Sequence, residues 1–317
     1  AYFVNAFLQR FAGFGTSSGE SVFNKIFGTE VWRAMLGSEI LPALLFFTLL
    51  FLVPKSPRWL IMKGQRQRAR TILLKFGDEH HADKEIKDVE ANLERGVGGI
   101  KMAFSGGFRV ALLLGIALAV STQISGINAI IYYGPRILEQ AGLQLSEALG
   151  GQVVIGMVNV LFTIVAIRKI DDLGRRKLLL YGLSGILFSL IVIGILFFYQ
   201  VGSTYLLMAF ILLFIACFAF SYGPVIWVLL SEIYPLKIRG AAMSLATISL
   251  WAGTAFIGQM TPWLLENLQP YGTFWFFAAC TVPAMIMTIF ILPETKGKTL
   301  EEIEKYWLLR NNDAVTK

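Results

Sequence analysis

Long apolar stretches alternate with short polar segments along the chain, and this alternation predicts the secondary structure. Five stretches contain no Asp, Glu, Lys or Arg, at 110–135, 148–167, 178–231, 240–265 and 267–293. They hold 26, 20, 54, 26 and 27 residues, and a helix that crosses a bilayer needs about 20 apolar residues. The 54-residue stretch is interrupted by Gln200, Gly202, Ser203 and Thr204, so we expect it to form two helices.

With one further apolar segment near the beginning, the pattern predicts seven complete membrane-spanning helices. They are expected at 34–53, 110–135, 148–167, 178–199, 205–231, 240–265 and 272–292. Residues 1–9 resemble the end of an eighth helix, so we interpret the chain, which starts in mid-pattern, as a fragment. The composition is 56% hydrophobic and only 15% charged, against about a quarter charged in soluble domains. We therefore expect an all-α polytopic membrane protein, and not an ordinary water-soluble enzyme.

Lys and Arg are distributed unequally among the predicted connections. The connection 54–109, those after 167 and 231, and the C-terminal tail together hold 24 of the 28 residues. Lys and Arg accumulate on the cytoplasmic side of membrane proteins. The bias fits seven spans in strict alternation, and it predicts a cytoplasmic C-terminus. The net charge of +7 is thereby explained by topology, without binding to nucleic acid.

The connection 54–109 is long and basic. Apolar residues recur among the charges at 66–76 and 83–95, which predicts short amphipathic helices at the cytoplasmic face. His80 and His81 are interpreted as solvated residues of this surface and not as a metal site. A long linker before six spans is typical of the junction between two transporter halves. We therefore divide the chain into the end of an N-terminal helical half (1–53), a cytoplasmic linker (54–109), a C-terminal six-helix half (110–292) and a cytoplasmic tail (293–317).

Uncharged polar side chains inside the spans are candidates for a binding site, because polar groups are costly in hydrocarbon and usually face a cavity or another helix. Gln123 and Asn128 lie on either side of Gly126, which tolerates a helix break, and Pro135 is expected to restrict the end of the helix. An amide donates and accepts hydrogen bonds, as each hydroxyl of a sugar does. We therefore favour a cavity for a neutral polyol. Hydrogen bonding between helices is the alternative.

A second predicted break adds aromatic side chains. Gly223 and Pro224 lie deep in the fifth span, where such a pair interrupts a helix and frees backbone polar groups. Trp227 follows this break and Trp251 lies within the sixth span; an indole face can pack against the C–H face of a sugar ring. Asn159 is equally compatible with a cavity and with a helix contact. Catalytic constellations and phosphate-binding glycine loops are absent from the sequence, so we expect neither an enzyme nor an organic or metal cofactor.

Five motifs occur in an order that is typical of one transporter family. They are PKSPRWL at 54–60, QISGINAIIYY at 123–133, DDLGRRK at 171–177, GPVIW with SEIYP and RG at 223–240, and PETKG at 293–297. Together they resemble the sugar porters of the major facilitator superfamily, from late helix five through helix twelve, and are most similar to the bacterial D-xylose–proton symporters. Three positions depart from the family pattern: Thr122 and Leu250, where an amide is common, and Lys55, where Glu is usual.

The resemblance implies transport of a monosaccharide, a pentose or hexose with xylose-like sugars favoured, by sugar–proton symport and alternating access in the cell membrane. A facilitative uniporter and a sugar sensor or receptor on a transporter scaffold are the alternatives. The implied partners are the sugar, the lipid bilayer and the missing N-terminal helices, with the proton as possible coupling ion. The implied sugar contacts are Thr122, Gln123, Asn128, Asn159, Phe218, Trp227 and Trp251; the gating residues are Tyr132, Tyr133, Gly223 and Pro224; and the cytoplasmic ion-pair network is Arg58, Arg175, Arg176, Glu232, Arg239 and Glu294.

Overall fold

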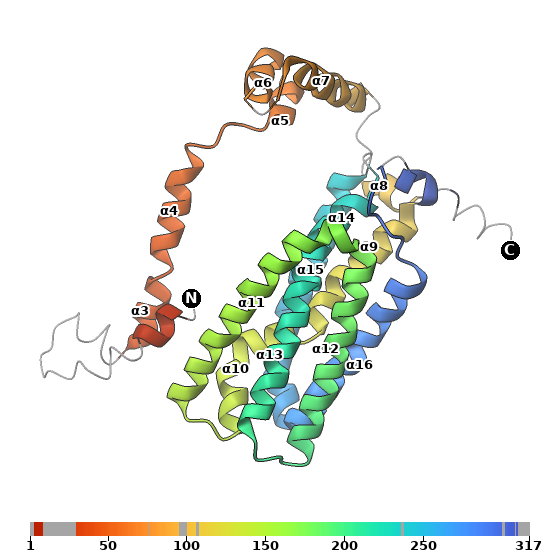
Figure 1. Ribbon diagram of the computed structural model, residues 1–317. Helices are drawn as coiled ribbons and strands as arrows, with labels where there is room; N and C mark the ends of the chain where they lie inside the picture. The colour runs from red at the N-terminus through yellow and green to blue at the C-terminus, as the bar shows by residue number, and fades with distance from the viewer. Residues whose placement is uncertain are drawn as a thin grey trace, which may run out of the picture. The chain divides into compact units, whose positions relative to one another are not determined.

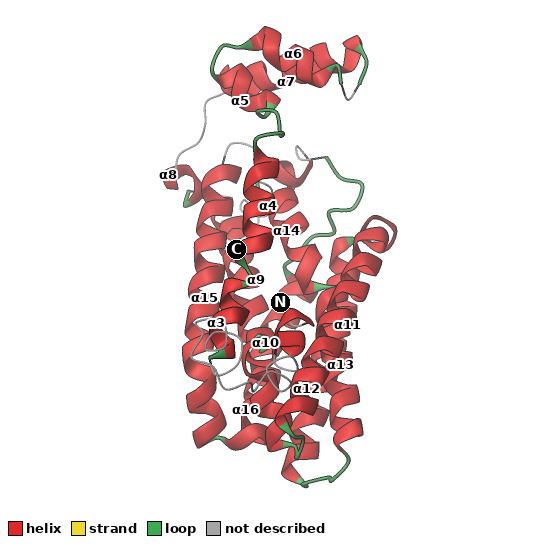
Figure 2. Ribbon diagram, turned by 90° about the vertical axis from the view of Figure 1, so that its left-hand side faces the viewer, coloured by secondary structure: helices red, strands yellow, loops and turns green. Residues whose placement is uncertain are grey.

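The computed structural model describes residues 3–8, 30–75, 77–94, 100–105, 108–235, 238–299, 302–307 and 309, and all regular structure within these ranges is helical (Figures 1 and 2). The chain forms two compact units, one from Phe3 to Gly98 and one from Gly99 to Lys317. Each unit is described by itself.

Seven helical segments in the described ranges are long and apolar enough to cross a membrane. They are Val31–Leu50, Phe108–Gln140, Glu147–Leu173, Arg175–Phe198, Thr204–Ile233, Arg239–Asn267 and Gln269–Phe290. Their number and order confirm the seven predicted spans, including the division of the 54-residue apolar stretch. Residues 3–8 are helical, as predicted for 1–9, while residues 1, 2 and 9 lie outside the described part.

The first unit contains one apolar helical segment and a small helical cluster. The helices α3 (Val31–Gly37) and α4 (Ile40–Leu50) form the apolar segment. The cluster consists of α5 (Pro57–Met62), α6 (Arg66–Leu73) and α7 (Glu79–Glu94), so that helices lie where the amphipathic pattern predicted them.

A small core and an ion pair hold the cluster together. Leu60, Ile61, Ala69 and Ile86 are buried against one another. The Nε of Arg70 donates to Oδ1 of Asp83 at 3.0 Å, and this hydrogen bond lowers the pKa of the Asp83 carboxyl. The apolar side of these helices therefore packs largely within the cluster itself.

The second unit is a bundle of the six remaining spans (Figure 1). It starts at α8 (Ile100–Ala103). Two spans consist of two helices each, namely α9 (Phe108–Ile124) with α10 (Ile127–Gln140), and α13 (Thr204–Phe220) with α14 (Tyr222–Ile233). The other four are α11 (Leu145–Leu173), α12 (Arg175–Phe198), α15 (Arg239–Asn267) and α16 (Gln269–Phe290). The core between them is formed mainly by buried Leu, Ile, Ala and Phe side chains.

The break between α9 and α10 lies at Gly126, as predicted. Gly126 has φ +89°, a left-handed conformation that side-chain-bearing residues rarely adopt. A Cβ at this position would also lie 2.6 Å from the ring of Phe277. Both the backbone conformation and the close approach of α16 therefore require glycine here.

Pro135 does not restrict the end of the helix, and this prediction was wrong. α10 continues through Pro135 to Gln140. A proline cannot donate to the carbonyl four residues earlier, which is that of Ile131. Gln152 of α11 replaces the missing donor, because its Nε2 donates to the Ile131 carbonyl at 3.0 Å. Gly134 provides the space, since a Cβ there would lie 2.2 Å from Oε1 of Gln152. A contact from the neighbouring helix thus lets α10 continue.

The second break was predicted at Gly223 and Pro224, but it lies at Ser221, which has φ −123° and ψ −84°. Pro224 belongs to the first turn of α14, where a backbone N–H has no partner within the helix and proline is tolerated. The Ser221 hydroxyl donates to the Cys217 carbonyl at 2.7 Å. Gly182 of α12 leaves room for this hydroxyl, because a Cβ there would lie 1.8 Å from it.

Candidate functional site

Polar side chains of three helices meet beside the break between α9 and α10. The Nδ2 of Asn128 donates to Oε1 of Gln123 at 2.5 Å, and Oγ1 of Thr254 on α15 donates to the same oxygen at 3.0 Å. The Nε2 of Gln123 donates to Oγ1 of Thr122 at 2.7 Å. Thr122 and Gln123 are buried, whereas Asn128 and Thr254 are half-buried. We call these four residues the amide cluster.

Within the amide cluster, Asn128 keeps both an acceptor and a donor for a further group. The Gln123 oxygen accepts two hydrogen bonds and its lone pairs are therefore occupied. Asn128 uses one N–H of its amide, and its Oδ1 and second N–H have no hydrogen-bond partner among the described residues. Asn128 thus offers one acceptor and one donor, which is what a sugar hydroxyl requires.

Thr254 was not among the predicted site residues. Leu250, at a position where the family commonly has an amide, is buried. The sequence gives only a weak indication of Thr254, which is a single threonine three residues after Trp251. This spacing places both residues on one face of the helix. Ser121 and Tyr222 were also missed. Their hydroxyl oxygens lie 2.9 Å apart, both residues are buried, and together they join α9 to α14 next to the second break.

The aromatic residues predicted for the site differ in burial. Trp227, Trp251 and Tyr132 are 43%, 61% and 53% exposed, and within the described ranges no hydrogen bond joins them to the amide cluster. Tyr133 is half-buried, and its hydroxyl donates to the Gly258 carbonyl of α15 at 2.9 Å. Phe218 packs against Tyr222 with ring centroids 5.9 Å apart.

The remaining predicted residues lie apart from the cluster's hydrogen bonds. Asn159 on α11 is half-buried, and its amide has no hydrogen-bond partner in the described part of the chain. Gly223 and Pro224 are half-buried in the first turn of α14. The structure therefore brings together Thr122, Gln123 and Asn128, while the sugar-binding role of the whole predicted set stays a prediction.

An ion pair lies at the end of the bundle where α11 passes into α12. Arg175 binds Glu232 in a bidentate manner, with Nε to Oε2 at 3.1 Å and Nη2 to Oε1 at 2.9 Å. The Arg175 side chain is only 12% exposed and that of Glu232 only 25%. Thr295 donates to Oε2 of Glu232 at 2.6 Å, and the exposed Asp171 lies 2.8 Å from the Arg175 guanidinium.

Glu294 binds the backbone at the start of α12. Its two carboxylate oxygens accept from the backbone N–H of Arg175 and Arg176 at 2.9 and 3.2 Å. The positive end of a helix dipole stabilises an anion in this position. Gly174 provides the space, because a Cβ there would lie 2.7 Å from the carboxylate. Glu294 therefore acts here through helix capping.

The arginines of the predicted network also bind backbone carbonyls. The Arg176 side chain donates to the carbonyls of Thr288 and Ile289, and that of Arg239 donates to the Tyr234 carbonyl. The side chain of Arg58 lies outside the described part. That these residues hold one conformational state stays a prediction.

Tyr234 is buried at this same end, and its hydroxyl has no hydrogen-bond partner in the described ranges. Burial raises the pKa of the phenol, and Gly115 of α9 leaves room for it, since a Cβ there would lie 1.9 Å from the hydroxyl. An unpaired buried hydroxyl costs about 1–3 kcal/mol.

We expect Tyr234→Phe to leave the free energy of unfolding unchanged or to raise it by about 1 kcal/mol, because an unpaired buried group is removed. Gly115→Ala is the matched control on the other side of the contact, and it should lower that free energy because it overpacks the same space. Both are measured by thermal unfolding of the purified protein. A clear loss of stability in Tyr234→Phe would mean that the hydroxyl has a partner.

In the described ranges, no group of three or more His, Cys, Asp or Glu side chains is arranged to hold a metal ion. The side chain of His81 is outside these ranges, and that of His80 is exposed.

The sequence and the fold match known membrane transporters. The family model of the sugar (and other) transporters matches residues 6–307. The arabinose-proton symporter of Bacillus subtilis is 36% identical over 97% of this chain and 64% of its own length, and the D-xylose-proton symporter of Escherichia coli is 34% identical over 96% and 61%. A solved structure of a major facilitator superfamily proton:xylose symporter, bound to 6-bromo-6-deoxy-D-glucose, matches with a TM-score of 0.81 at 34% identity, over 96% of this chain and 63% of that one. The chain thus spans less than two thirds of the length of these relatives.

Proposed function

Because the chain belongs to the sugar (and other) transporter family, we propose that it contributes to a sugar–proton symporter, which moves a monosaccharide across the cell membrane by alternating access. Its fold is that of the major facilitator superfamily, as predicted, and it is a multi-pass membrane protein. The relatives named above are symporters of arabinose and D-xylose, which supports a pentose or a similar hexose as the substrate.

The observation that carries the proposal is the unpaired acceptor and donor of Asn128 beside the helix break. The amide cluster contains no ionisable side chain, so it suits a neutral ligand. Gln123 and Thr254 fix the orientation of the Asn128 amide before the sugar arrives, which reduces the entropy lost on binding. The exposed indoles of Trp227 and Trp251 offer apolar faces for the C–H side of a sugar ring.

The proposal includes a topology and a set of partners. The excess of Lys and Arg in alternate connections supports a cytoplasmic C-terminus. The partners are the monosaccharide, the surrounding lipid and the N-terminal helices of the same transporter, with the proton as coupling ion. The protein transports its substrate without chemical change and is therefore not an enzyme. Bilayer-embedded helices that hold a neutral solute need no organic cofactor for this cycle.

The test compares sugar uptake by variants of the complete protein. We expect Asn128→Ala and Trp227→Ala each to weaken the apparent affinity for the transported sugar about tenfold, because each removes roughly one hydrogen bond or stacking contact. Asn267→Ala and Trp263→Ala are matched controls, since both residues are exposed near the end of α15, away from the amide cluster. Uptake of radiolabelled D-xylose, L-arabinose, D-glucose and D-galactose is measured in cells, with expression checked by immunoblot.

Unchanged uptake in both Asn128→Ala and Trp227→Ala would remove the proposed site. Proton coupling is tested separately in proteoliposomes. A symporter accumulates sugar above its equilibrium level when a pH gradient is imposed, whereas a uniporter only equilibrates it. A sensor would bind the sugar without moving it.

A further inference from the structure

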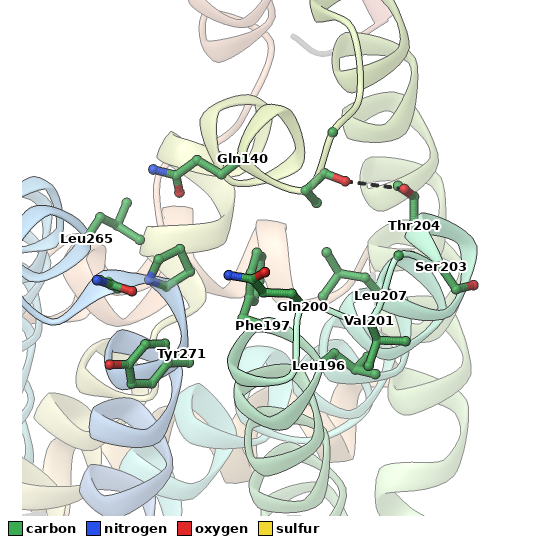
Figure 3. Close-up of a pocket in the computed structure, with 15 residues that line it drawn as sticks. Gln140, Leu196, Phe197, Gln200, Val201, Ser203, Thr204, Leu207, Leu265 and Tyr271 are labelled. Carbon is green, nitrogen blue, oxygen red and sulfur yellow. Dashed lines mark hydrogen bonds between the residues drawn. The ribbon is translucent and has the colours of Figure 1, made fainter.

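A cavity of about 610 Å³ lies among the ends of the helices in the second unit (Figure 3), and α12 separates it from the Arg175–Glu232 ion pair. It is lined by three connections, namely those between α10 and α11, between α12 and α13, and between α15 and α16. The helix α12 starts at Arg175 and ends at Phe198, so about 35 Å separates the ion pair from the cavity. The topology proposed above places the cavity on the extracellular side.

The lining of the cavity suits a neutral ligand with many hydroxyl groups. Its apolar part includes Leu196, Leu207 and Leu265, which are buried. Its polar part includes Gln140, Gln200 and Tyr271 (Figure 3). Gln269 is a third glutamine of the lining, and no lining residue is charged. The three amide side chains are exposed and have no hydrogen-bond partner in the part of the chain that the structure describes. Each of them therefore offers donors and an acceptor to a ligand.

Two of these glutamines occupy backbone positions that favour glycine. Gln200 and Gln269 have φ +48° and +56°, and they are the two described non-glycine residues with positive φ. Gln200 is the second residue after the end of α12. There the Val201 N–H donates to the Leu196 carbonyl at 3.0 Å, and the Gln200 N–H donates to the Phe197 carbonyl at 3.3 Å. This hydrogen-bond pattern is that of a helix end at which glycine is the usual residue. Both strained positions belong to the lining of the same cavity, and strain of this kind clusters at ligand sites.

We propose that this cavity is a second carbohydrate site, separate from the amide cluster, which binds a neutral saccharide through the amides of Gln140, Gln200 and Gln269. Its volume lies within the range of about 300–1,000 Å³ that is typical of small-molecule sites. The absence of charge on the lining disfavours phosphates and carboxylates. The saccharide is either a free sugar or the head group of a glycolipid, since both present the same hydroxyl groups.

The test uses the double variant Gln200→Gly/Gln269→Gly, because glycine fits the positive φ and removes only the side chains. The protein is placed in phosphatidylcholine nanodiscs without maltoside or glucoside detergents, which are saccharides themselves. Binding of D-xylose and of maltose is measured by saturation-transfer NMR titration, and nanodiscs with and without a monoglucosyl lipid form the second arm. Thermal unfolding is recorded for each variant.

We expect the double variant to bind the saccharide of this site at least fivefold more weakly while its thermal stability is unchanged or higher. Asn128→Ala should leave this site intact and weaken only the other one, so failure of the two proposals can be told apart. Signals with maltose or xylose identify a free sugar, and displacement of these signals by the glucosyl lipid identifies a head group. Equal binding in the wild type and the double variant, or no saccharide binding that survives Asn128→Ala, would overturn the proposal.

Discussion

Replacing Glu232 by alanine is expected to lower the free energy of unfolding by about 3–5 kcal/mol, because it leaves the largely buried Arg175 guanidinium without its bidentate partner. The substitution also removes the hydrogen bond from Thr295, which donates to the same carboxylate. Asp171 also lies near Arg175, but its side chain is 79% exposed and compensates little. The measurement is thermal and denaturant unfolding of the purified protein.

Two further variants make this expectation specific. Asp171→Ala removes the exposed partner of the same arginine and should cost less than about 1 kcal/mol. Arg175→Met combined with Glu232→Met should recover much of the loss, because two apolar side chains replace the whole pair and no charge stays buried alone. If Glu232→Ala and Asp171→Ala had equal effects, the ion pair between α12 and α14 would not stabilise the bundle as described.

Introducing a methyl group at Gly134 is expected to cost about 2–4 kcal/mol. The Cβ of Gly134→Ala would lie 2.2 Å from Oε1 of Gln152, which is only 4% exposed and has no room to move without other shifts. Displacement of Gln152 also removes its hydrogen bond to the Ile131 carbonyl, and Pro135 cannot replace that bond. The stability loss is measured as above, and a loss of order in α10 is followed by hydrogen exchange.

The partner side chain provides the control for Gly134. In the background Gln152→Ala, the clash is gone, so adding Gly134→Ala should cost much less than it does in the wild type. Gln152→Ala by itself should cost about 1–3 kcal/mol, because it leaves the Ile131 carbonyl unsatisfied. Additive effects of the two substitutions would contradict a direct contact between Gly134 and Gln152.

These contacts also bear on the proposed transport cycle. α10 carries Asn128 near its start, and it is held by Gln152 of α11 and by the bond from Tyr133 to the Gly258 carbonyl of α15. Tyr132 on the same helix is exposed and makes neither bond. If α10 moves as a gate, either these two hydrogen bonds break or α11 and α15 move together with α10. The Gln152 variants test the first of the two bonds.

The sequence by itself determined the number of spans, their order and the break at Gly126. Charge-free stretches indicate the spans directly, because the thickness of the bilayer sets the length of a span. Each apolar residue adds to the hydropathy of its span regardless of which residues pack against it. The break at Gly126 was also accessible, because the positive φ is a property of one residue. The polarity of Gln123 and Asn128, which is likewise local, pointed to the polar cluster beside this break.

Only the tertiary structure decided which groups pair with which. Pro135 should end a helix by its own chemistry, yet α10 continues because Gln152 of another helix supplies the missing donor. Thr254 joins the amide cluster although it is 131 residues from Gln123, and the second carbohydrate cavity gathers residues from three separate connections. Hydropathy is a property summed along the chain. Satisfaction of a buried polar group depends on the atoms that packing brings within about 3 Å, and no local pattern specifies those atoms.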